Sequence, residues 1–360
     1  MIDRNKHLTS ALRDLELDAI FITKYENQRY LEGFTGHDCF LLASGAGNFL
    51  IADSRYTEMA SRECAVAKII PHRPPHPPLN KVVSRLAEES GLKRIGFEGG
   101  HITYNQYESL SKALSEKNIA MVPANAVLEK IRAVKEPEET RMIEHACGIA
   151  DRALDGLLKI LKPDLSELDV KVELDYLLKS CGAEEAAFDT MVLFGARASQ
   201  PHANSSRDAK LREGDFILID YGAMVNGYRS DMTRTFICGR ADPEQRRAYN
   251  TVKYAQAEAT ALVRPGANGR EINELAVNIL KNAGFPPFEY GVGHGVGLEI
   301  HEEPFLRQKA DVILRSGMTL SIEPGIYIPG WGGIRIEDTV LVTDKGHKIL
   351  TSFTKEMIEV

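Results

Sequence analysis

The chain has 360 residues, of which 43% are apolar and 26% are charged, and its formal net charge is −7. This length allows two domains with ordinary cores. A negative net charge without a basic cluster argues against a surface for nucleic acid or for anionic membranes, and no apolar run approaches the roughly 18 residues that a membrane helix needs.

The cysteines are odd in number and lack the CxxC spacing of a thiolate metal site. We therefore predict five buried free thiols. The first residues, Met1 to Arg4, do not resemble a signal peptide, so we expect the protein in the cytoplasm. The cysteines are Cys39, Cys64, Cys147, Cys181 and Cys238.

Residues 1 to about 125 alternate short apolar runs with amphipathic runs, which predicts an α/β domain with a mixed sheet. The proline-rich stretch from His72 to Pro78 is predicted to be an extended surface loop and not a metal site. The predicted strands are 19–23, 40–42, 49–52, 68–70 and 94–97, and the predicted helices are 79–89 and 104–114.

A domain boundary is predicted before Pro137, where a proline precedes two acids at a helix start. The predicted domains are therefore residues 1–130 and 131–360. Apolar residues recur at three-and-four spacing from Met142 to Leu161, which predicts an amphipathic helix that ends at Lys162-Pro163. Ser166 is predicted to cap a second helix.

Residues 211–236 predict a β-hairpin, because Asn226-Gly227 is the favoured two-residue type I′ turn. With these two residues as the loop, Asp220 and Asp231 lie on the same face of the hairpin and converge diagonally. Gly222 lies between them, and we expect it to leave room for a bound group.

The pattern of two helices and a hairpin occurs twice. Asp242 is predicted to cap the first helix of the second copy, 243–262, with Pro243 at its first position, and the second helix is predicted at 269–283. Residues 314–325 align without a gap onto residues 211–222, so Glu323 corresponds to Asp220. Glu337 corresponds to Asp231 after three extra residues in the turn. Two related halves are therefore predicted to share one site.

Between the helices and the hairpin of the second half, glycine occupies every second position around His294. The spacing differs from the GxGxxG fingerprint of dinucleotide-binding proteins. Glycines at these positions would let the backbone approach another group closely.

Four carboxylates in one cleft repel each other and lose hydration, so two divalent cations are expected to neutralise them. Oxygen ligands with one nitrogen and no sulfur favour Mn²⁺ or Co²⁺, with Fe²⁺ and Zn²⁺ as alternatives. Two such ions about 3.5–4 Å apart would acidify a shared water, which indicates hydrolysis of a carbonyl or phosphoryl bond. Each acid taken alone could be a solvated strand residue, but their matched positions favour a site. The candidate ligands are Asp220, Asp231, His294, Glu323 and Glu337.

The candidate ligands lie in five segments, residues 219–222, 230–235, 293–297, 321–325 and 333–338. These segments resemble the motifs of the pita-bread metallopeptidases, and within them the Xaa-Pro peptidases, prolidase and aminopeptidase P. Residues 52–56 resemble the N-terminal domain of creatinase-type enzymes. The resemblance implies an α/β (α+β) protein with a C-terminal pita-bread fold of two pseudo-symmetric halves and a smaller N-terminal domain.

The resemblance also implies roles for the ligands. Asp220 would hold one metal, Asp231 and Glu337 would bridge both, and His294 and Glu323 would complete the other. Glu323 would also handle the proton of the attacking hydroxide.

Two histidines match the family pattern, and Arg335 lies two residues before Glu337 on the same strand face. His202 and His301 would face the substrate, stabilise the oxyanion and contact the proline. Arg335 would orient a bridging carboxylate or bind the product, and its alternative is a surface salt bridge. Residues 194–200 depart from the small-residue segment that is usual in the family.

The implied reaction is hydrolysis of the bond between an N-terminal residue and proline by a hydroxide that bridges two metals. The partner is a small peptide with proline at the second position, and the family implies a homodimer. The compact first domain favours a dipeptidase over an aminopeptidase.

Three alternatives remain. Methionine aminopeptidases share the ligands but generally lack an N-terminal domain of this size. Creatinase has both domains but does not retain the ligands. A pita-bread module used only for binding usually has lost ligands.

Overall fold

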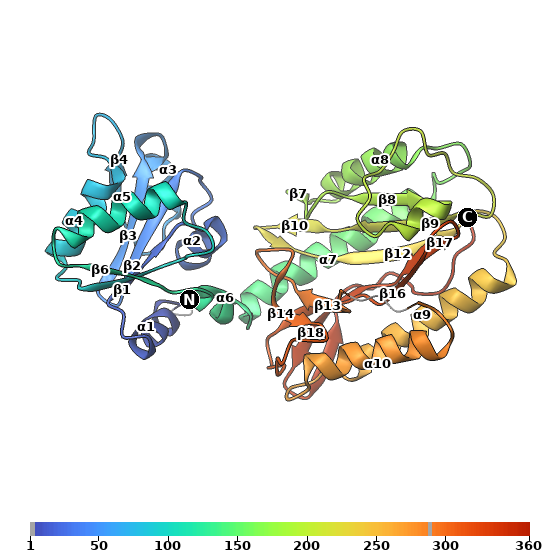
Figure 1. Cartoon of the computed structure of the whole chain (residues 1–360). Helices are drawn as coiled ribbons and strands as arrows, with labels where there is room; N and C mark the ends of the chain where they lie inside the picture. The colour runs from blue at the N-terminus through green and yellow to red at the C-terminus, as the bar shows by residue number, and fades with distance from the viewer. Residues whose placement is uncertain (1–3, 287–289) are drawn as a thin grey trace. The chain divides into compact units, whose positions relative to one another are not determined.

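A computed structural model describes residues 4–286 and 290–360, and the chain divides into two compact units, Met1–Arg132 and Ala133–Val360 (Figure 1). Residues 1–3, where we expect no signal peptide, lie outside the described residues. Among the described helices, none has the length and apolar character that crossing a bilayer requires.

The N-terminal unit is a six-stranded sheet in the order β4-β3-β2-β1-β5-β6. Strands β1, β2 and β3 pair antiparallel, whereas β4, β5 and β6 run parallel to their neighbours, so the predicted mixed sheet is confirmed. The strands are β1 (Ala19–Ile22), β2 (Cys39–Ser44), β3 (Gly47–Asp53), β4 (Lys68–His72), β5 (Arg94–Phe97) and β6 (Ala120–Pro123). The helices are α1 (Arg4–Asp14), α2 (Tyr25–Glu32), α3 (Thr57–Glu63), α4 (Leu79–Glu89), α5 (Tyr104–Ser115) and α6 (Val127–Arg132), and the 3₁₀ turn η1 is Ser54–Tyr56.

The prediction that His72 lies in an extended surface loop is wrong. This residue ends β4, pairs with Asp53 of β3 and is buried, and the exposed proline-rich loop begins after it. The prediction that all five cysteines are buried is also wrong, because Cys64 and Cys181 are partly exposed; all five are free.

The C-terminal unit contains two helix pairs with the predicted caps. Helix α7 (Pro137–Leu158) ends before the predicted Lys162-Pro163, and α8 (Glu167–Ser180) follows it. The Ser166 hydroxyl accepts a hydrogen bond from Asp169 N, and the Asp242 carboxylate caps α9 (Pro243–Ala261) in the same way. Helix α10 is Gly269–Asn282.

Strands β8 (Met191–Phe194) and β9 (Phe216–Tyr221) contribute side chains to two different cores. Successive side chains of a strand point to opposite faces. Leu193 and Leu218 pack in the core that includes α9 and α10, whereas Val192 and Ile217 pack in the core that includes α7 and α8. The helix pairs therefore cover opposite faces of these strands (Figure 1).

The first hairpin has the predicted register. Val225 pairs with Tyr228 across Asn226 and Gly227, whose φ angles of 49° and 77° are those of a type I′ turn. Further along the hairpin, Thr233 pairs with Asp220. The strands after β9 are β10 (Ala223–Val225), β11 (Tyr228–Arg229) and β12 (Met232–Ile237).

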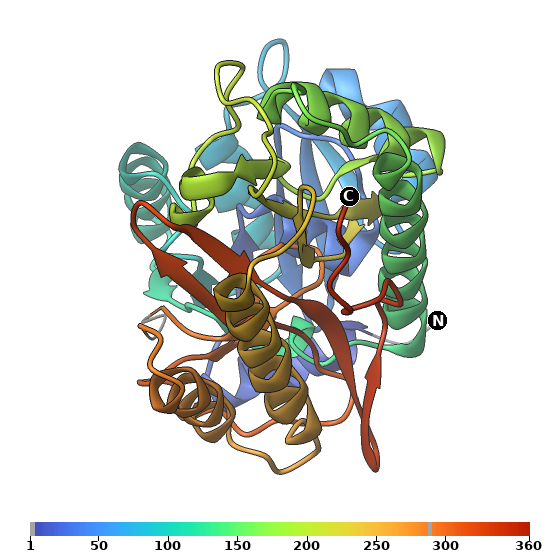
Figure 2. The same cartoon turned by 90° about the vertical axis from the view of Figure 1, so that its right-hand side faces the viewer.

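The two acids of the second hairpin are paired differently from those of the first. Ile322 pairs with Asp338 and Gly325 with Arg335, so Glu323 lies directly opposite Glu337, whereas Asp220 and Asp231 are diagonal neighbours. The remaining strands are β7 (Glu185–Ala186), β13 (Gly293–Gly295), β14 (Glu302–Leu306), β15 (Thr319–Ile322), β16 (Gly325–Ile328), β17 (Gly332–Arg335), β18 (Asp338–Thr343) and β19 (Gly346–Ile349). After β19 the chain runs back beside α7, where Ser352 N donates to Asp151 (Figure 2).

Candidate metal centre

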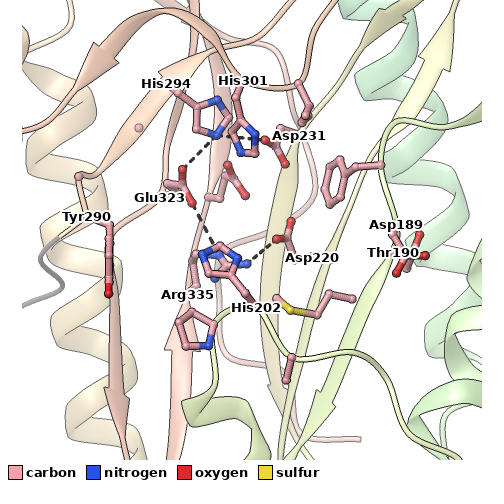
Figure 3. Close-up of a pocket in the computed structure, with 18 of the residues that line it drawn as sticks. Asp189, Thr190, His202, Asp220, Asp231, Tyr290, His294, His301, Glu323 and Arg335 are labelled. Carbon is pink, nitrogen blue, oxygen red and sulfur yellow. Dashed lines mark hydrogen bonds and ion pairs between the residues drawn. The ribbon is translucent and has the colours of Figure 1, made fainter.

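One cavity of about 430 Å³ in the C-terminal unit collects every site residue that the sequence predicts (Figure 3). The two hairpins and the glycine-rich β13 supply six of them, and His202 and His301 come from the segments before β9 and β14. They are His202, Asp220, Asp231, His294, His301, Glu323, Arg335 and Glu337.

Asp231, His294 and Glu337 form the tightest group. They are buried, and one potential ligand atom from each lies within 4.8 Å of the others. His294 Nε2 is 3.5 Å from Asp231 Oδ2 and 3.2 Å from Glu323 Oε1. His294 Nδ1 lies 3.1 Å from the carbonyl oxygen of Gly295, so it can donate there and leave Nε2 free to bind a metal.

Asp220 and Glu323 lie in the same cavity, outside this group of three, and Arg335 interacts with both. Its Nη2 forms an ion pair with Asp220 Oδ2, and its Nε is 3.8 Å from Glu323 Oε2. Arg335 is only 3% exposed, so the alternative of a surface salt bridge is wrong.

The electrostatics of the cavity show a deficit of positive charge. Burial raises the pKa of Asp231 well above its usual value, and the charges of Glu337 and Asp220 raise it further. Burial likewise raises the pKa of Glu337 well above its usual value, followed by the charge of Glu323. Among the described residues, Asp220 Oδ1 and Glu337 Oε1 are buried without a hydrogen-bond partner. Divalent cations would provide both the charge and the missing partners, so this donor set fits a metal pair.

Sequence reasoning missed three residues that hold the candidate ligands in place. The Thr233 hydroxyl donates to Glu337 Oε2 at 2.7 Å and accepts from Arg335 Nε at 2.9 Å. The Ser321 hydroxyl is 3.2 Å from Glu323 Oε1, and the Tyr327 hydroxyl accepts from Arg335 Nη1 at 2.7 Å. Thr233 follows Asp231 by two positions and Ser321 precedes Glu323 by two, so strand periodicity could have identified both.

Gly222 does not have the predicted purpose, whereas Gly293 lets the backbone approach another group closely, as predicted. A Cβ on Gly222 would lie 1.9 Å from the carbonyl oxygen of Ser230, so this position is filled by the neighbouring strand and does not leave room for a bound group. A Cβ on Gly293 would lie 2.0 Å from the carbonyl oxygen of Ser321. Glycine thus lets the strands that carry the acids and the histidine pack closely together.

Two further histidines reach the opening of the cavity. His301 and His202 are exposed, and the ring centroid of His301 is 4.3 Å from that of His294. Partial loss of hydration on the cavity side lowers the pKa of His301, and the neighbouring His294 lowers it further, so His301 can act as a neutral donor.

The segment before His202, residues 194–200, lies outside the lining of the cavity. Residues 195–199 form the 3₁₀ turn η2 (Gly195–Ser199), which packs against β17. A Cβ on Gly333 of β17 would lie 2.0 Å from the carbonyl oxygen of Ala198. The cavity wall formed by this part of the chain begins at Pro201.

A buried ion pair fixes the residue that follows His301. Lys135 Nζ is 2.7 Å from Glu302 Oε1, and the two side chains are 1% and 3% exposed. Glu302 is the first residue of β14, and His301, which lines the cavity, directly precedes it. Anchoring Glu302 in the interior therefore fixes the backbone next to His301.

The Lys135→Met variant should lose about 3–5 kcal/mol in the free energy of unfolding, because it leaves the Glu302 carboxylate buried without its cation. Urea denaturation would measure this loss. Lys345→Met, at an exposed position, is the control and should change stability by less than about 0.5 kcal/mol. The double variant Lys135→Met, Glu302→Gln should recover much of the loss. Equal stability of Lys135→Met and the wild type would refute the anchoring role.

Comparison with known proteins identifies the class. Residues 141–344 match the model of "Metallopeptidase family M24", and residues 4–134 match that of the "Creatinase/Prolidase N-terminal domain". The Xaa-Pro dipeptidase of Pyrococcus horikoshii is 34% identical over 99% of each chain. A solved Xaa-Pro dipeptidase from Bacillus anthracis superposes with a TM-score of 0.94 at 34% identity over 99% of each chain. The X-Pro aminopeptidase from Thermotoga maritima gives a TM-score of 0.89 at 29% identity, covering 98% of this chain and 100% of that one.

The fold and the cavity thus define a metallopeptidase of the pita-bread type with a creatinase-like N-terminal unit. The chain belongs to the metallopeptidase family M24 and, within it, to the Xaa-Pro peptidase branch.

Proposed function

We propose that the protein hydrolyses the peptide bond between an N-terminal residue and proline, and that it is a dipeptidase that uses two divalent ions. The observation that carries this proposal is the convergence of four carboxylates and one imidazole on a single cavity. Asp220, Asp231, His294, Glu323 and Glu337 would hold the ions. Their oxygen-rich chemistry favours Mn²⁺ or Co²⁺. When bound, such a pair of ions activates water as a nucleophile near neutral pH.

The side chains around the ligands would handle the proton and the developing charge. Glu323, beside His294 Nε2, would take the proton of the attacking water. His202 and His301, at the cavity opening, would donate to the oxyanion that forms at the scissile carbonyl. Burial raises the pKa of Asp220, and the charge of Arg335 opposes this by favouring the ionised carboxylate. Through the Thr233 hydroxyl, Arg335 would also orient Glu337.

The remaining cavity wall supports a short substrate whose second residue is proline. A proline nitrogen carries no N–H, so recognition of its residue depends on the shape of an apolar surface. Phe188, Ile300 and Phe305 supply that surface. The guanidinium of Arg307, on the same wall, lies 5.1 Å from the centroid of the Phe305 ring. This cation could bind the terminal carboxylate of a dipeptide.

The direct test compares Ala-Pro with Ala-Pro-Ala in the presence of Mn²⁺. We expect Ala-Pro to be cleaved with the higher kcat/KM. Arg307→Ala should lower kcat/KM for Ala-Pro by about tenfold or more, because a hydrogen bond to a charged group contributes about 1.5–3 kcal/mol, and it should affect Ala-Pro-Ala less. Arg270→Ala, on α10 outside the cavity lining, is the control. Preferred cleavage of Ala-Pro-Ala would establish an aminopeptidase instead.

Two other assays separate the remaining alternatives. Cleavage of Met-Ala-Ser in preference to Ala-Pro would indicate methionine aminopeptidase activity. Metal analysis of the purified protein should find about two ions per chain for the enzyme and none for a binding module. Homodimer formation and a cytoplasmic location remain predictions; the five free cysteines agree with a reducing compartment.

A further inference from the structure

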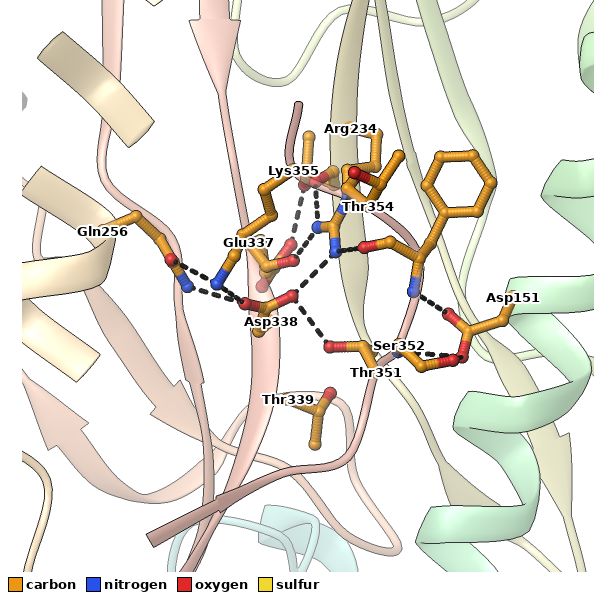
Figure 4. Close-up of polar contacts among 12 residues, drawn as sticks. Asp151, Arg234, Gln256, Glu337, Asp338, Thr339, Thr351, Ser352, Thr354 and Lys355 are labelled. Carbon is orange, nitrogen blue, oxygen red and sulfur yellow. Dashed lines mark hydrogen bonds and ion pairs between the residues drawn. The ribbon is translucent and has the colours of Figure 1, made fainter. Parts of the chain in front are cut away.

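A buried polar cluster behind the cavity connects the C-terminal segment, residues 351–355, to the candidate metal centre (Figure 4). At its middle, Arg234 Nη2 donates to Asp338 Oδ1 at 2.8 Å, and both residues are 1% exposed. The catalytic proposal uses neither residue. Removing these two charges from water is costly unless further hydrogen bonds satisfy them.

Arg234 joins three segments of the chain. Its Nη1 donates to the carbonyl oxygens of Thr233 and Glu337. Its Nη2 also donates to the carbonyl oxygen of Phe353 at 2.7 Å, and its Nε to that of Thr354 at 3.1 Å. The guanidinium therefore links β12, the backbone of a candidate metal ligand and the C-terminal segment.

Asp338 receives donors from the same C-terminal segment. The Thr351 hydroxyl donates to its Oδ1 at 2.9 Å, and Lys355 Nζ donates to its Oδ2 at 2.6 Å. Gln256 Nε2 completes the set at 3.0 Å from Oδ2. At the other side of the segment, the backbone N–H groups of Ser352 and Phe353 donate to Asp151 of α7. The segment is thus fixed at both sides.

The two central residues of the cluster are neighbours in the chain of the groups that fix the candidate ligands. Arg234 follows Thr233, and Asp338 lies between Glu337 and Thr339. Glu337 N donates to the carbonyl oxygen of Thr233 at 3.1 Å, which adds to the contact with the Thr233 hydroxyl. The hydroxyl of Thr339, the residue after Asp338, donates to the carbonyl oxygen of Asp231 at 2.8 Å. The positions of Asp231 and Glu337 relative to each other therefore depend on the contact between β12 and the start of β18.

We propose that the C-terminal segment is a positioning element of the metal centre, in which Lys355, acting through Asp338 and Arg234, holds Asp231 and Glu337 at ligand spacing. This inference rests on the proposed function, since it concerns the affinity of the proposed ions. Ligands must be held within about 0.5 Å of the productive geometry, and loss of an outer partner of a ligand typically costs 10- to 100-fold in metal affinity.

The test measures Mn²⁺ binding to the full-length protein by titration calorimetry. Lys355→Met should raise the Kd for Mn²⁺ by about tenfold, while circular dichroism shows a folded metal-free protein. At saturating Mn²⁺ the KM for Ala-Pro should remain that of the wild type, and Lys355→Arg should restore most of the affinity. Lys253→Met is the matched control, because it removes a 2.7 Å ion pair to Glu356 next to the segment without touching Asp338. Its Kd should stay within twofold of the wild-type value.

An unchanged Kd in Lys355→Met, or an equal weakening in Lys253→Met, would overturn the inference. If Lys355→Met fails to fold, Thr351→Val removes a single hydrogen bond to Asp338, and its Kd must then rise for the inference to stand. A wild-type protein that binds no Mn²⁺ would refute the proposed function, whereas a wild type that binds and a Lys355→Met variant that binds equally well would refute this inference alone.

Discussion

The Asp231→Asn variant is expected to lose at least about 10²-fold in kcat/KM for Ala-Pro, because a lost ligand should cost more than a lost outer partner. The substitution keeps the size of the side chain but removes one of the charges that would neutralise the ions. The same variant should bind less Mn²⁺. Its metal-free form should be at least as stable as the wild type, since burial and the charges of Glu337 and Asp220 disfavour an ionised Asp231.

A stopped assay with Ala-Pro and added Mn²⁺, together with metal analysis, measures both effects. Asp155→Asn, at an exposed position on α7, is the control and should retain wild-type activity. Wild-type rates in Asp231→Asn would remove this residue from the proposed ligand set. Inactivity with full metal content would assign it a role in catalysis rather than in metal binding.

Removing the metal should make the stability of the protein depend strongly on pH. In the metal-free protein the folded-state pKa values of Asp231 and Glu337 lie above their unfolded values. Their contribution to stability is therefore complete below the unfolded pKa, about 4, and it is lost as the pH rises through the raised folded-state values. The metal-free protein should thus become less stable as the pH rises above about 4.

Addition of Mn²⁺ should reverse this loss. A ligand present at a thousand times its Kd stabilises the folded state by about 4 kcal/mol, which corresponds to a rise in Tm of roughly 10 °C. The rise should be larger at pH 8 than at pH 5, because protons compete with the metal for the carboxylates. Differential scanning calorimetry measures it. The double variant Asp231→Asn, Glu337→Gln should show little of either effect, and a wild-type Tm that ignores both Mn²⁺ and pH would contradict the metal centre.

Local chemistry in the sequence predicted the elements that carry the site. The Asn226-Gly227 turn set the hairpin register, and strand periodicity then placed Asp220 and Asp231 on one face. The caps at Ser166 and Asp242 marked the starts of two helices. Helix α1 was missed because only Leu8 and Leu12 of its residues are buried, which is too few to produce a visible period.

Contacts between distant segments could not be predicted in the same way. Lys135 and Glu302 form a buried pair although they are far apart in the chain, and neither lies in a motif that indicates a partner. The sequence predicts space for a bound group beside Gly222, whereas that space holds the carbonyl of Ser230. Only the packing of the strands distinguishes a glycine that leaves space for a ligand from a glycine that lets a neighbouring strand approach.

The strands β8 and β9 couple the unfolding of the two halves of the C-terminal unit. Their side chains alternate between the two cores, so the helix pairs of both halves pack on the same two strands. Neither half can melt while the other stays intact, because melting one exposes the apolar surface of the other. The two related halves are therefore not independent folding units, and the C-terminal unit should denature in a single cooperative transition.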